Sequence, residues 1–340
     1  MERKILIPRL DGSESKVAFG SAGELLAEFL PATARVIVIA DANIDRCHAE
    51  LLAPYEKIII GQGESIKTLH TVEELVRELI SREADRSTFL LGIGGGIVTD
   101  ITGFVASIYM RGIRFGFVPT TLLAQVDASV GGKNGVNLDG FKNMVGCFNQ
   151  PEFVICDSAL LGSLPDREFR AGIAEMVKAA VIGDETLFEL FENHSFDDFR
   201  KDTELLSQAI ERAVRVKAAI VERDEREAGE RRLLNLGHTI GHAIEKCSRK
   251  ILHGEAVAAG MGVVARYAAE RGVCSTECAE RIITLLDNYG LPTSSPVDSH
   301  ELQNAILRDK KRRGNLLALI LPERVGKCRI EEVEICEKQS

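Results

Sequence analysis

The 340-residue chain contains no tryptophan and only four tyrosines, and its lysines and arginines are outnumbered by its aspartates and glutamates, giving a net charge of −9. Nucleic-acid-binding surfaces depend on clustered basic side chains. The sequence therefore predicts no nucleic-acid partner. An anionic ligand would have to be bound by a local group of cations.

Long apolar runs are also absent. No stretch reaches about eighteen consecutive apolar residues, the length that a membrane-spanning helix needs, and the apolar run near the first residue is too short for a signal peptide. The eight cysteines form no Cys-x-x-Cys pair, which excludes a zinc ribbon and a thioredoxin-like motif. We therefore expect a cytoplasmic protein with no membrane partner and with reduced, buried thiols.

The first half of the chain alternates strand-like and helix-like patterns. Capping-box sequences at Ser21 to Glu24 and Thr71 to Glu74 precede amphipathic segments. Short runs of β-branched and aromatic residues predict strands at 35–39, 57–60, 89–91, 115–118 and 153–155. This alternation predicts a Rossmann-like, mainly parallel sheet with helices on its faces.

The hydrophobic period changes to that of helices from about residue 160 onward. One late apolar run, 315–322, predicts a strand. The amphipathic segments are 204–222, 234–246, 255–271 and 277–288. We predict an α/β domain over residues 1–158 and a mostly α-helical domain over residues 159–340.

A glycine-rich turn, Gly92 to Gly96, follows the strand predicted at 89–91. Glycines at a helix N-terminus let backbone N–H groups approach a pyrophosphate. The spacing is not Gly-x-Gly-x-x-Gly, because Ile97 replaces the third glycine, so a tight turn without a ligand explains the pattern about equally well. Asp41, Glu64 and Lys67 also follow predicted strands, where nucleotides bind in such sheets. For Glu64 and Lys67 individually, the alternative is a solvated turn.

Glycines, hydroxyls and cations concentrate between residues 111 and 146. Pro119-Thr120-Thr121, Gly131-Gly132-Lys133 and Lys142-Asn143 are expected in turns between elements. Such turns often bind phosphate and nicotinamide groups. The segment therefore favours a dinucleotide site beside an anion site.

Three of the seven histidines, His238, His242 and His253, lie close together in the sequence. His238 and His242 are four residues apart, on one face of a helix. Glu175 is a candidate acidic ligand. Two histidines and a carboxylate leave open positions on Zn²⁺, as a catalytic site requires. A single histidine would more often be structural, but this cluster predicts a divalent-metal site.

Together these motifs resemble the 3-dehydroquinate synthase family of sugar phosphate cyclases, from about Asp41 to Lys311. Asn134 stands where threonine is usual, and Ser163 replaces another threonine but keeps its hydroxyl. The matching residues are Gly94 to Gly96 with Asp100, Arg111-Gly112, Pro119 to Leu123, Gly131 to Lys133, Lys142-Asn143, Glu175, Lys178, Lys217, Arg231, Asn235, His238, His242, His253 to Glu255 and Asp309 to Lys311.

The resemblance implies a homodimeric lyase that uses NAD⁺ catalytically, together with Zn²⁺ or Co²⁺. Its substrate would be a small anionic sugar phosphate, 3-deoxy-D-arabino-heptulosonate 7-phosphate. The family oxidises this substrate, eliminates phosphate, reduces the product again and closes it to 3-dehydroquinate, in the shikimate pathway to aromatic amino acids. Several cations acting on one substrate would explain how an acidic chain binds a polyanion.

The resemblance also assigns roles to residues by position. It implies metal ligation by Glu175, His238 and His253. The cofactor contacts it implies are Asp41, Glu64, Lys67, Gly95, Gly96, Asp100, Thr120, Thr121, Asp127, Lys133, Lys142 and Ser163. The substrate contacts are Arg111, Lys133, Lys142, Asn143, Lys178, Lys217, Arg231, Asn235, His242, Lys310 and Lys311. Of these, Lys133, Lys178, Lys217, Arg231, Asn235, His242 and Lys311 are expected to be catalytic.

Three alternatives stay open. Another sugar phosphate cyclase would use the same chemistry on a different phosphorylated sugar, although Lys217 and Arg231 favour a carboxylated substrate. A metal-dependent polyol dehydrogenase of the same fold would release NADH, but Lys133 and Lys142 are superfluous for an uncharged alcohol. An inactive binding protein is disfavoured, because each metal and cofactor position holds a competent residue type.

Overall fold

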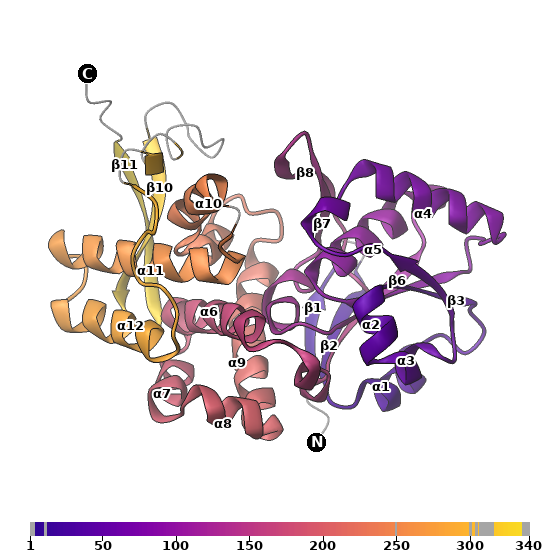
Figure 1. Cartoon of the computed structure of the whole chain (residues 1–340), viewed down its shortest axis with the longest axis horizontal. Coiled ribbons are helices and arrows are strands. Elements are labelled where there is room, and N and C mark those ends of the chain that lie inside the picture. Colours follow the sequence, from indigo (N-terminus) through magenta and orange to yellow (C-terminus); the bar gives the residue numbers. More distant parts are fainter. Residues whose placement is uncertain are drawn as a thin grey trace. The chain divides into compact units, whose positions relative to one another are not determined.

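The computed structural model describes residues 4–9, 12–248, 250–298, 301, 302, 305 and 316–334. The chain separates into two compact units, Met1–Pro165 and Asp166–Ser340, whose elements are labelled in Figure 1. The sequence-based boundary lay between residues 158 and 159, just inside the short 3₁₀ segment η4 (Ser158–Ser163). Among the described residues, no helix has both the length and the hydrophobicity needed to cross a bilayer.

The first unit is built on a seven-stranded sheet. All neighbouring strands are parallel except the pair at one edge, β1 and β2, so the prediction of a mainly parallel sheet is confirmed. In spatial order the strands are β1 (Lys4–Pro8), β2 (Glu14–Phe19), β9 (Phe153–Cys156), β6 (Arg114–Pro119), β5 (Phe89–Gly94), β3 (Val36–Asp41) and β4 (Glu56–Ile60).

The strand order reverses at β3, whose two neighbours are β4 on one side and β5 on the other. In open α/β sheets, ligands bind at such a switch point, outside the carboxyl ends of the strands. Those ends are Asp41 of β3 and Gly94 of β5. The topology therefore brings the predicted acidic residue and the glycine turn to the same edge of the sheet.

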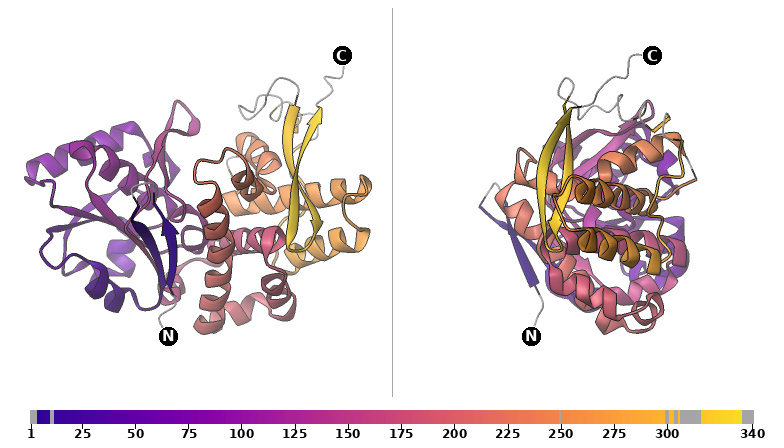
Figure 2. Two further views of the ribbon diagram at one scale, coloured as in Figure 1. Left: turned by 180° about the vertical axis from the view of Figure 1, so that it is seen from behind. Right: turned by 90° about the vertical axis from the view of Figure 1, so that its left-hand side faces the viewer.

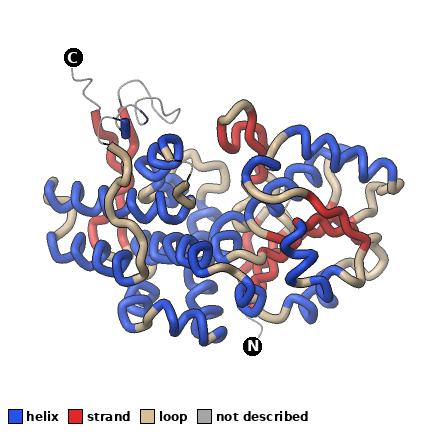
Figure 3. The backbone as a smooth tube through the Cα atoms, viewed as in Figure 1, coloured by secondary structure: helices blue, strands red, loops and turns tan. Residues whose placement is uncertain are grey.

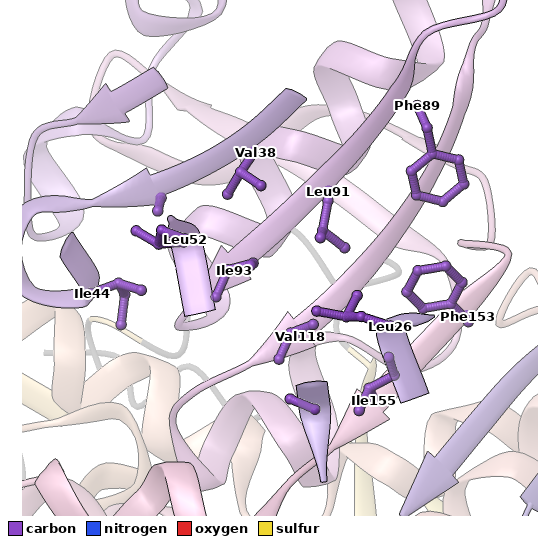
Figure 4. Packing of buried hydrophobic residues seen from close by; sticks show 12 residues of the cluster. Leu26, Val38, Ile44, Leu52, Phe89, Leu91, Ile93, Val118, Phe153 and Ile155 are labelled. Carbon is purple, nitrogen blue, oxygen red and sulfur yellow. The ribbon is translucent and has the colours of Figure 1, made fainter. Parts of the chain in front are cut away.

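Apolar side chains hold these two strands in place (Figure 4). Val38 of β3 and Leu91 and Ile93 of β5 belong to one buried cluster, together with Leu26 and Ile44 from the helical segments. Each such buried side chain contributes about 1.5–3 kcal/mol to folding. The cluster therefore fixes the strand ends that carry the candidate site.

The predicted capping boxes do not form, although the first helix does begin directly after Ser21. Thr71 lies inside its helix, because Thr68 is the N-cap and its hydroxyl accepts from the Thr71 N–H at 3.3 Å. Ser21 makes no side-chain cap; instead the Asp157 carboxylate accepts from the Ala22 N–H at 2.8 Å. The helices are α1 (Ala22–Phe29), α2 (Ala42–Cys47), α3 (Ala49–Leu52), α4 (Leu69–Ser81) and α5 (Gly96–Ile108).

A separate β-hairpin, β7 (Lys133–Leu138) and β8 (Phe141–Phe148), lies where the sequence analysis expected turns. That expectation was wrong for Lys133 and for the Lys142-Asn143 pair, which lie in the strands of this hairpin. Figure 3 colours the backbone by secondary structure, with strands in red. Asp139 and Gly140 connect the strands with φ of 49° and 79°. An Asp-Gly pair with positive φ at both residues is typical of a tight hairpin turn, so the signal was present in the sequence.

The second unit is mostly helical, as predicted. The late strand is confirmed as β10 (Leu316–Arg324). It packs beside α11 (His253–Glu270), as Figure 2 shows. It also pairs with β11 (Lys327–Glu334), a strand that was not predicted. The helices are α6 (Asp166–Gly183), α7 (Glu185–Asn193), α8 (Phe196–Lys201), α9 (Thr203–Arg223), α10 (His238–Cys247), α11 (His253–Glu270) and α12 (Thr276–Asn288).

Candidate active site

The glycine turn joins β5 directly to α5. Gly95 is the N-cap of α5 and carries no side chain that would cover the first N–H groups of the helix. A Cβ atom at Gly94 would lie 2.5 Å from Val98 Cγ2, and one at Gly95 would lie 3.0 Å from Thr121 Cγ2. Glycine at these positions therefore allows the turn to pack closely against Val98 and Thr121, and leaves no side chain over the N–H groups that could bind a phosphate.

Thr120 lies beside this turn. Its N–H donates to the Gly94 carbonyl at 2.9 Å, and its side chain is buried. The Thr120 hydroxyl has no hydrogen-bond partner among the described residues. A buried, unsatisfied hydroxyl costs free energy unless a ligand pairs with it. The turn and this hydroxyl together fit a bound dinucleotide.

Two further predicted cofactor residues have protein partners. Asp41 caps α2, since its Oδ1 accepts from the N–H groups of Asn43 at 2.8 Å and Ile44 at 3.1 Å. Ser163 Oγ lies 3.0 Å from His48 Nε2. Burial lowers the pKa of His48 below its usual value, so the imidazole is neutral at neutral pH.

Three other predicted residues meet at one ammonium group, that of Lys67, which contacts Asp100 and Asn143. Lys67 is 6% exposed. Its Nζ lies 2.5 Å from Asp100 Oδ2 and 2.6 Å from Asn143 Oδ1. A buried lysine needs such partners, because an unpaired buried charge is costly.

The remaining predicted residues of the first unit lie on several elements. Arg111 ends a short 3₁₀ segment, η2 (Tyr109–Arg111), with φ of 68°. Asp127 lies in a π-helical turn, η3 (Ala124–Ala128). Lys133 begins β7 and Lys142 lies on β8, and both are exposed.

The metal-ligand candidates converge in the second unit. Glu175 lies in the middle of α6, while His238 and His253 are the first residues of α10 and α11. Glu175 Oε1 is 3.7 Å from His238 Nε2 and 3.6 Å from His253 Nε2. One ligand atom from each residue lies within 4.8 Å of the others. This is the separation expected around one metal ion.

Hydrogen bonds at the far nitrogens orient both imidazoles. His238 Nδ1 lies 3.1 Å from the Leu236 carbonyl, and His253 Nδ1 lies 3.3 Å from Glu245 Oε2. An Nδ1–H donor leaves the Nε2 lone pair for a metal. Glu245 was not assigned a role from the sequence. The only signal there was its position on α10, in the helix that carries His238 and His242.

Glu175 fits a bound cation. Its side chain is 1% exposed, and Lys178 forms an ion pair with its Oε2. Its Oε1 has no hydrogen-bond partner among the described residues. An orphaned buried carboxylate oxygen facing two imidazole nitrogens is what Zn²⁺ or Co²⁺ would satisfy.

The start of α11 is held by a second carboxylate, Glu255. It accepts from the Leu252 N–H at 2.8 Å and forms a two-bond pair with Arg167 of α6, at 2.6 and 2.7 Å. Because α6 also carries Glu175, this pair links the helices that bear two of the candidate ligands. It therefore helps to set the separation between Glu175 and His253.

Buried cations accompany the cluster in the second unit. Lys178, Lys217 and Arg231 are 3%, 8% and 2% exposed. Such residues are rarely buried without a partner or an anionic ligand. Asn235 Nδ2 donates to Glu227 at 2.6 Å, and the His242 ring lies 5.4 Å from that of His238. Lys310 and Lys311 lie outside the described residues.

The fold and this cluster place the protein in the class of the sugar phosphate cyclases. The structure is similar to 2-deoxy-scyllo-inosose synthase complexed with carbaglucose-6-phosphate, NAD⁺ and Co²⁺, with a TM-score of 0.87, 29% identity and coverage of 97% of this chain and 96% of that one. It is also similar to 2-epi-5-epi-valiolone synthase from Streptomyces hygroscopicus subsp. jinggangensis 5008 with NAD⁺ and Zn²⁺ bound, with a TM-score of 0.85, 27% identity and coverage of 96% and 94%.

Within this class, the chain belongs to the 3-dehydroquinate synthase family. Its residues 57–171 match the family model for the 3-dehydroquinate synthase N-terminal region, and residues 172–312 match the C-terminal model. The 3-dehydroquinate synthase of Halorhodospira halophila is 45% identical over 309 residues, which cover 89% of this chain and 87% of that protein. The resemblance inferred from the motifs is confirmed.

Proposed function

We propose that the protein is a phosphate-eliminating lyase that converts 3-deoxy-D-arabino-heptulosonate 7-phosphate to 3-dehydroquinate and inorganic phosphate in the shikimate pathway. The observation that carries this proposal is the approach of Glu175 Oε1 to the Nε2 atoms of His238 and His253, in a chain of this family. Glu175, His238 and His253 would hold Zn²⁺ or Co²⁺. The metal supplies a Lewis acid, and NAD⁺ supplies a hydride acceptor that is regenerated.

The first unit would bind NAD⁺ and the phosphate group. The Gly94 to Gly96 turn would receive a pyrophosphate at the start of α5, and the buried Thr120 hydroxyl would offer it or the nicotinamide a partner. Arg111, Lys133 and Lys142 would bind the substrate phosphate, since charge-assisted contacts are the strong ones for this dianion.

The second unit would bind the rest of the substrate. The buried cations Lys178, Lys217 and Arg231 suit a carboxylate and hydroxyls, together with Asn235 and Lys310 or Lys311. His242 lies next to the metal cluster, in a position to hold or move a proton at the reacting hydroxyl. A carboxylated substrate is the partner that these cations favour over the uncarboxylated sugar phosphate of another cyclase.

The test that separates a cyclase from a polyol dehydrogenase follows both products at once. With the heptulosonate phosphate and NAD⁺, inorganic phosphate should accumulate in many-fold excess over enzyme, while no net NADH absorbance develops. Stoichiometric NADH release would instead identify a dehydrogenase. Turnover of a phosphorylated sugar that lacks a carboxylate, at an equal rate, would favour another cyclase.

The cofactor contact is tested separately by Gly95→Val, which places a branched side chain against Thr121. We expect NAD⁺ binding, measured by calorimetry, to be lost in a protein that still folds, with the melting temperature lowered by the overpacking against Thr121. Unchanged NAD⁺ affinity would place the dinucleotide elsewhere.

We also propose that the protein is a cytoplasmic homodimer. The β7–β8 hairpin exposes a group of large apolar side chains, Leu138, Phe141, Met144 and Phe148. Grouped apolar side chains on a surface are typical of an interaction site. The cysteines in the described part of the chain form no disulfide, as expected in a reducing compartment. Sedimentation should report a dimer that Phe141→Ser weakens, and a monomer in the unaltered protein would refute the assembly.

A further inference from the structure

Asn137, near the end of β7, connects two groups of residues to which roles were proposed above. Its backbone N–H donates to the Lys67 carbonyl at 2.8 Å. Its side-chain Nδ2 donates to Glu64 Oε1 at 2.7 Å, and its Oδ1 accepts from the Asn143 N–H at 2.9 Å. Asn137 therefore forms hydrogen bonds both to the loop of residues 61–68, which carries Glu64 and Lys67, and to β8.

The Lys67 side chain forms a second link between this loop and β8. Its Nζ lies 2.6 Å from Asn143 Oδ1 and 2.5 Å from Asp100 Oδ2. Asn137 and Lys67 thus bind the backbone and the side chain of Asn143 respectively. A network that satisfies both parts of one residue restrains it more than a single hydrogen bond does.

Asn143 needs this restraint because of its backbone. Its φ is 53°, in the left-handed region that non-glycine residues rarely adopt. Such a conformation persists where neighbouring contacts determine it. Since Lys142 directly precedes Asn143, the conformation held by Asn137 and Lys67 also sets the direction in which β8 presents the Lys142 side chain.

We infer that Asn137 is a positioning residue that links the loop binding NAD⁺ to the hairpin binding the substrate phosphate, so that the bound cofactor orders Lys142 and Asn143. The inference rests on the cofactor and phosphate roles proposed above. Glu64 would bind a hydroxyl of the cofactor, and this contact would restrain the carboxylate to which Asn137 donates. That restraint passes through the Asn137 carboxamide to the Asn143 N–H.

The experiment is amide hydrogen exchange on the whole protein, with and without saturating NAD⁺. In the unaltered chain, NAD⁺ should slow exchange both in residues 61–68 and in residues 141–148. In Asn137→Ala, residues 61–68 should still be protected, and the NAD⁺-dependent protection of 141–148 should fall severalfold, with the Lys67 contact to Asn143 accounting for what remains. NAD⁺ affinity should fall about five- to tenfold, the size expected from losing the hydrogen bond that orients Glu64.

Two further variants keep the test independent of misfolding. Asn137→Asp retains the size and the acceptor for Asn143 but cannot donate to Glu64, and should behave like Asn137→Ala. In the double variant Glu64→Gln with Asn137→Asp, the side chain at position 64 becomes the donor and the one at position 137 the acceptor. The hydrogen bond is thereby restored, and the hairpin protection should recover. The matched control is Asp139→Asn in the same hairpin, where φ of 49° suits asparagine.

The outcomes separate this inference from the function on which it rests. NAD⁺-dependent protection of 141–148 that is undiminished in Asn137→Ala would overturn the inference, as would its absence in the unaltered chain when 61–68 is protected. If NAD⁺ protects neither segment of the unaltered chain, the proposed cofactor site is itself wrong, and the linkage falls with it.

Discussion

At the scale of single residues, Glu245 shows how a side chain beyond the metal ligands sets their chemistry. Its Oε2 lies 3.3 Å from His253 Nδ1, and His253 Nε2 faces Glu175. A carboxylate on the far nitrogen fixes the tautomer and raises the basicity of a ligating histidine. His253 is the most exposed of the three candidate ligands, at 31% for its side chain, so it depends most on this contact.

Glu245→Gln tests this contact, because glutamine keeps the size of the side chain but is a weaker acceptor. We expect zinc affinity to fall about 10- to 100-fold, measured by competition with a chromophoric chelator. Glu270→Gln, at an exposed position at the end of α11, is the matched control and should bind zinc normally. Equal affinities in the two variants would remove Glu245 from the metal site.

The thiols give a second prediction at this scale. Cys274 and Cys278 are buried, and burial raises the pKa of Cys274 to about 11. The thiolate is the reactive form, so iodoacetamide should alkylate Cys274 about tenfold or more slowly than the exposed Cys47 at neutral pH. The rate at Cys274 should rise with pH until the thiol ionises. Peptide mass spectrometry measures both rates, and equal rates would contradict the burial.

At the scale of elements, the glycines of α11 determine how closely the helix packs. A Cβ atom at Gly254 would lie 2.0 Å from the Ala171 carbonyl of α6. One at Gly260 would lie 2.0 Å from the Gly237 carbonyl, next to His238. These close backbone approaches bring the starts of α10 and α11 to Glu175. The distances between the candidate metal ligands therefore depend on helix packing as well as on the ligand side chains.

Gly254→Ala should separate α11 from α6 and so move His253 away from Glu175. We expect a loss of stability of about 1–3 kcal/mol, typical of overpacking, together with weaker zinc binding. Denaturant unfolding and zinc titration measure the two effects. Gly23→Ala in α1, where a Cβ meets nothing within 4 Å, is the control, and a Gly254→Ala protein with unaltered zinc affinity would refute the packing argument.

The elements also show what the sequence could reveal. Buried parallel strands are almost continuously apolar, so β3, β5 and β9 were recognisable. The side chain that caps α1 was not, because the Asp157 carboxylate accepts from the Ala22 N–H from 135 positions away in the chain. Residue type and spacing indicated a metal cluster, and the family resemblance selected Glu175, His238 and His253 within it. The roles of Glu245 and Asn137 depend on contacts that only the folded chain makes.

At the scale of the whole molecule, the three candidate metal ligands lie in one unit, Asp166–Ser340, and the glycine turn lies in the other. Glu175 comes from a segment far in the sequence from the one that carries the two histidines. A ligand that binds only the folded state stabilises it by mass action, by about 2.7 kcal/mol at a hundredfold excess over the dissociation constant. Metal binding should therefore support the helical unit in particular.

Removing the metal with a chelator should lower the melting temperature, and added Zn²⁺ should restore it. Hydrogen exchange should locate the loss of protection in α6, α10 and α11, with the seven-stranded sheet unaffected. Adding NAD⁺ to the chelated protein should protect the sheet unit instead. A melting temperature indifferent to chelation, in protein shown to contain zinc beforehand, would exclude a structural contribution from the metal.

The close contacts of α11 also limit how this protein can be engineered for heat resistance. Replacing helical glycines by alanine is a common route to thermostability, worth about 0.4–1 kcal/mol per site where the backbone allows it. In α11 that route is closed, since a methyl group at Gly254, Gly260 or Gly262 would collide with a carbonyl of another segment. Variants made for industrial use should therefore begin with the open position at Gly23 and leave the glycines of α11 unchanged.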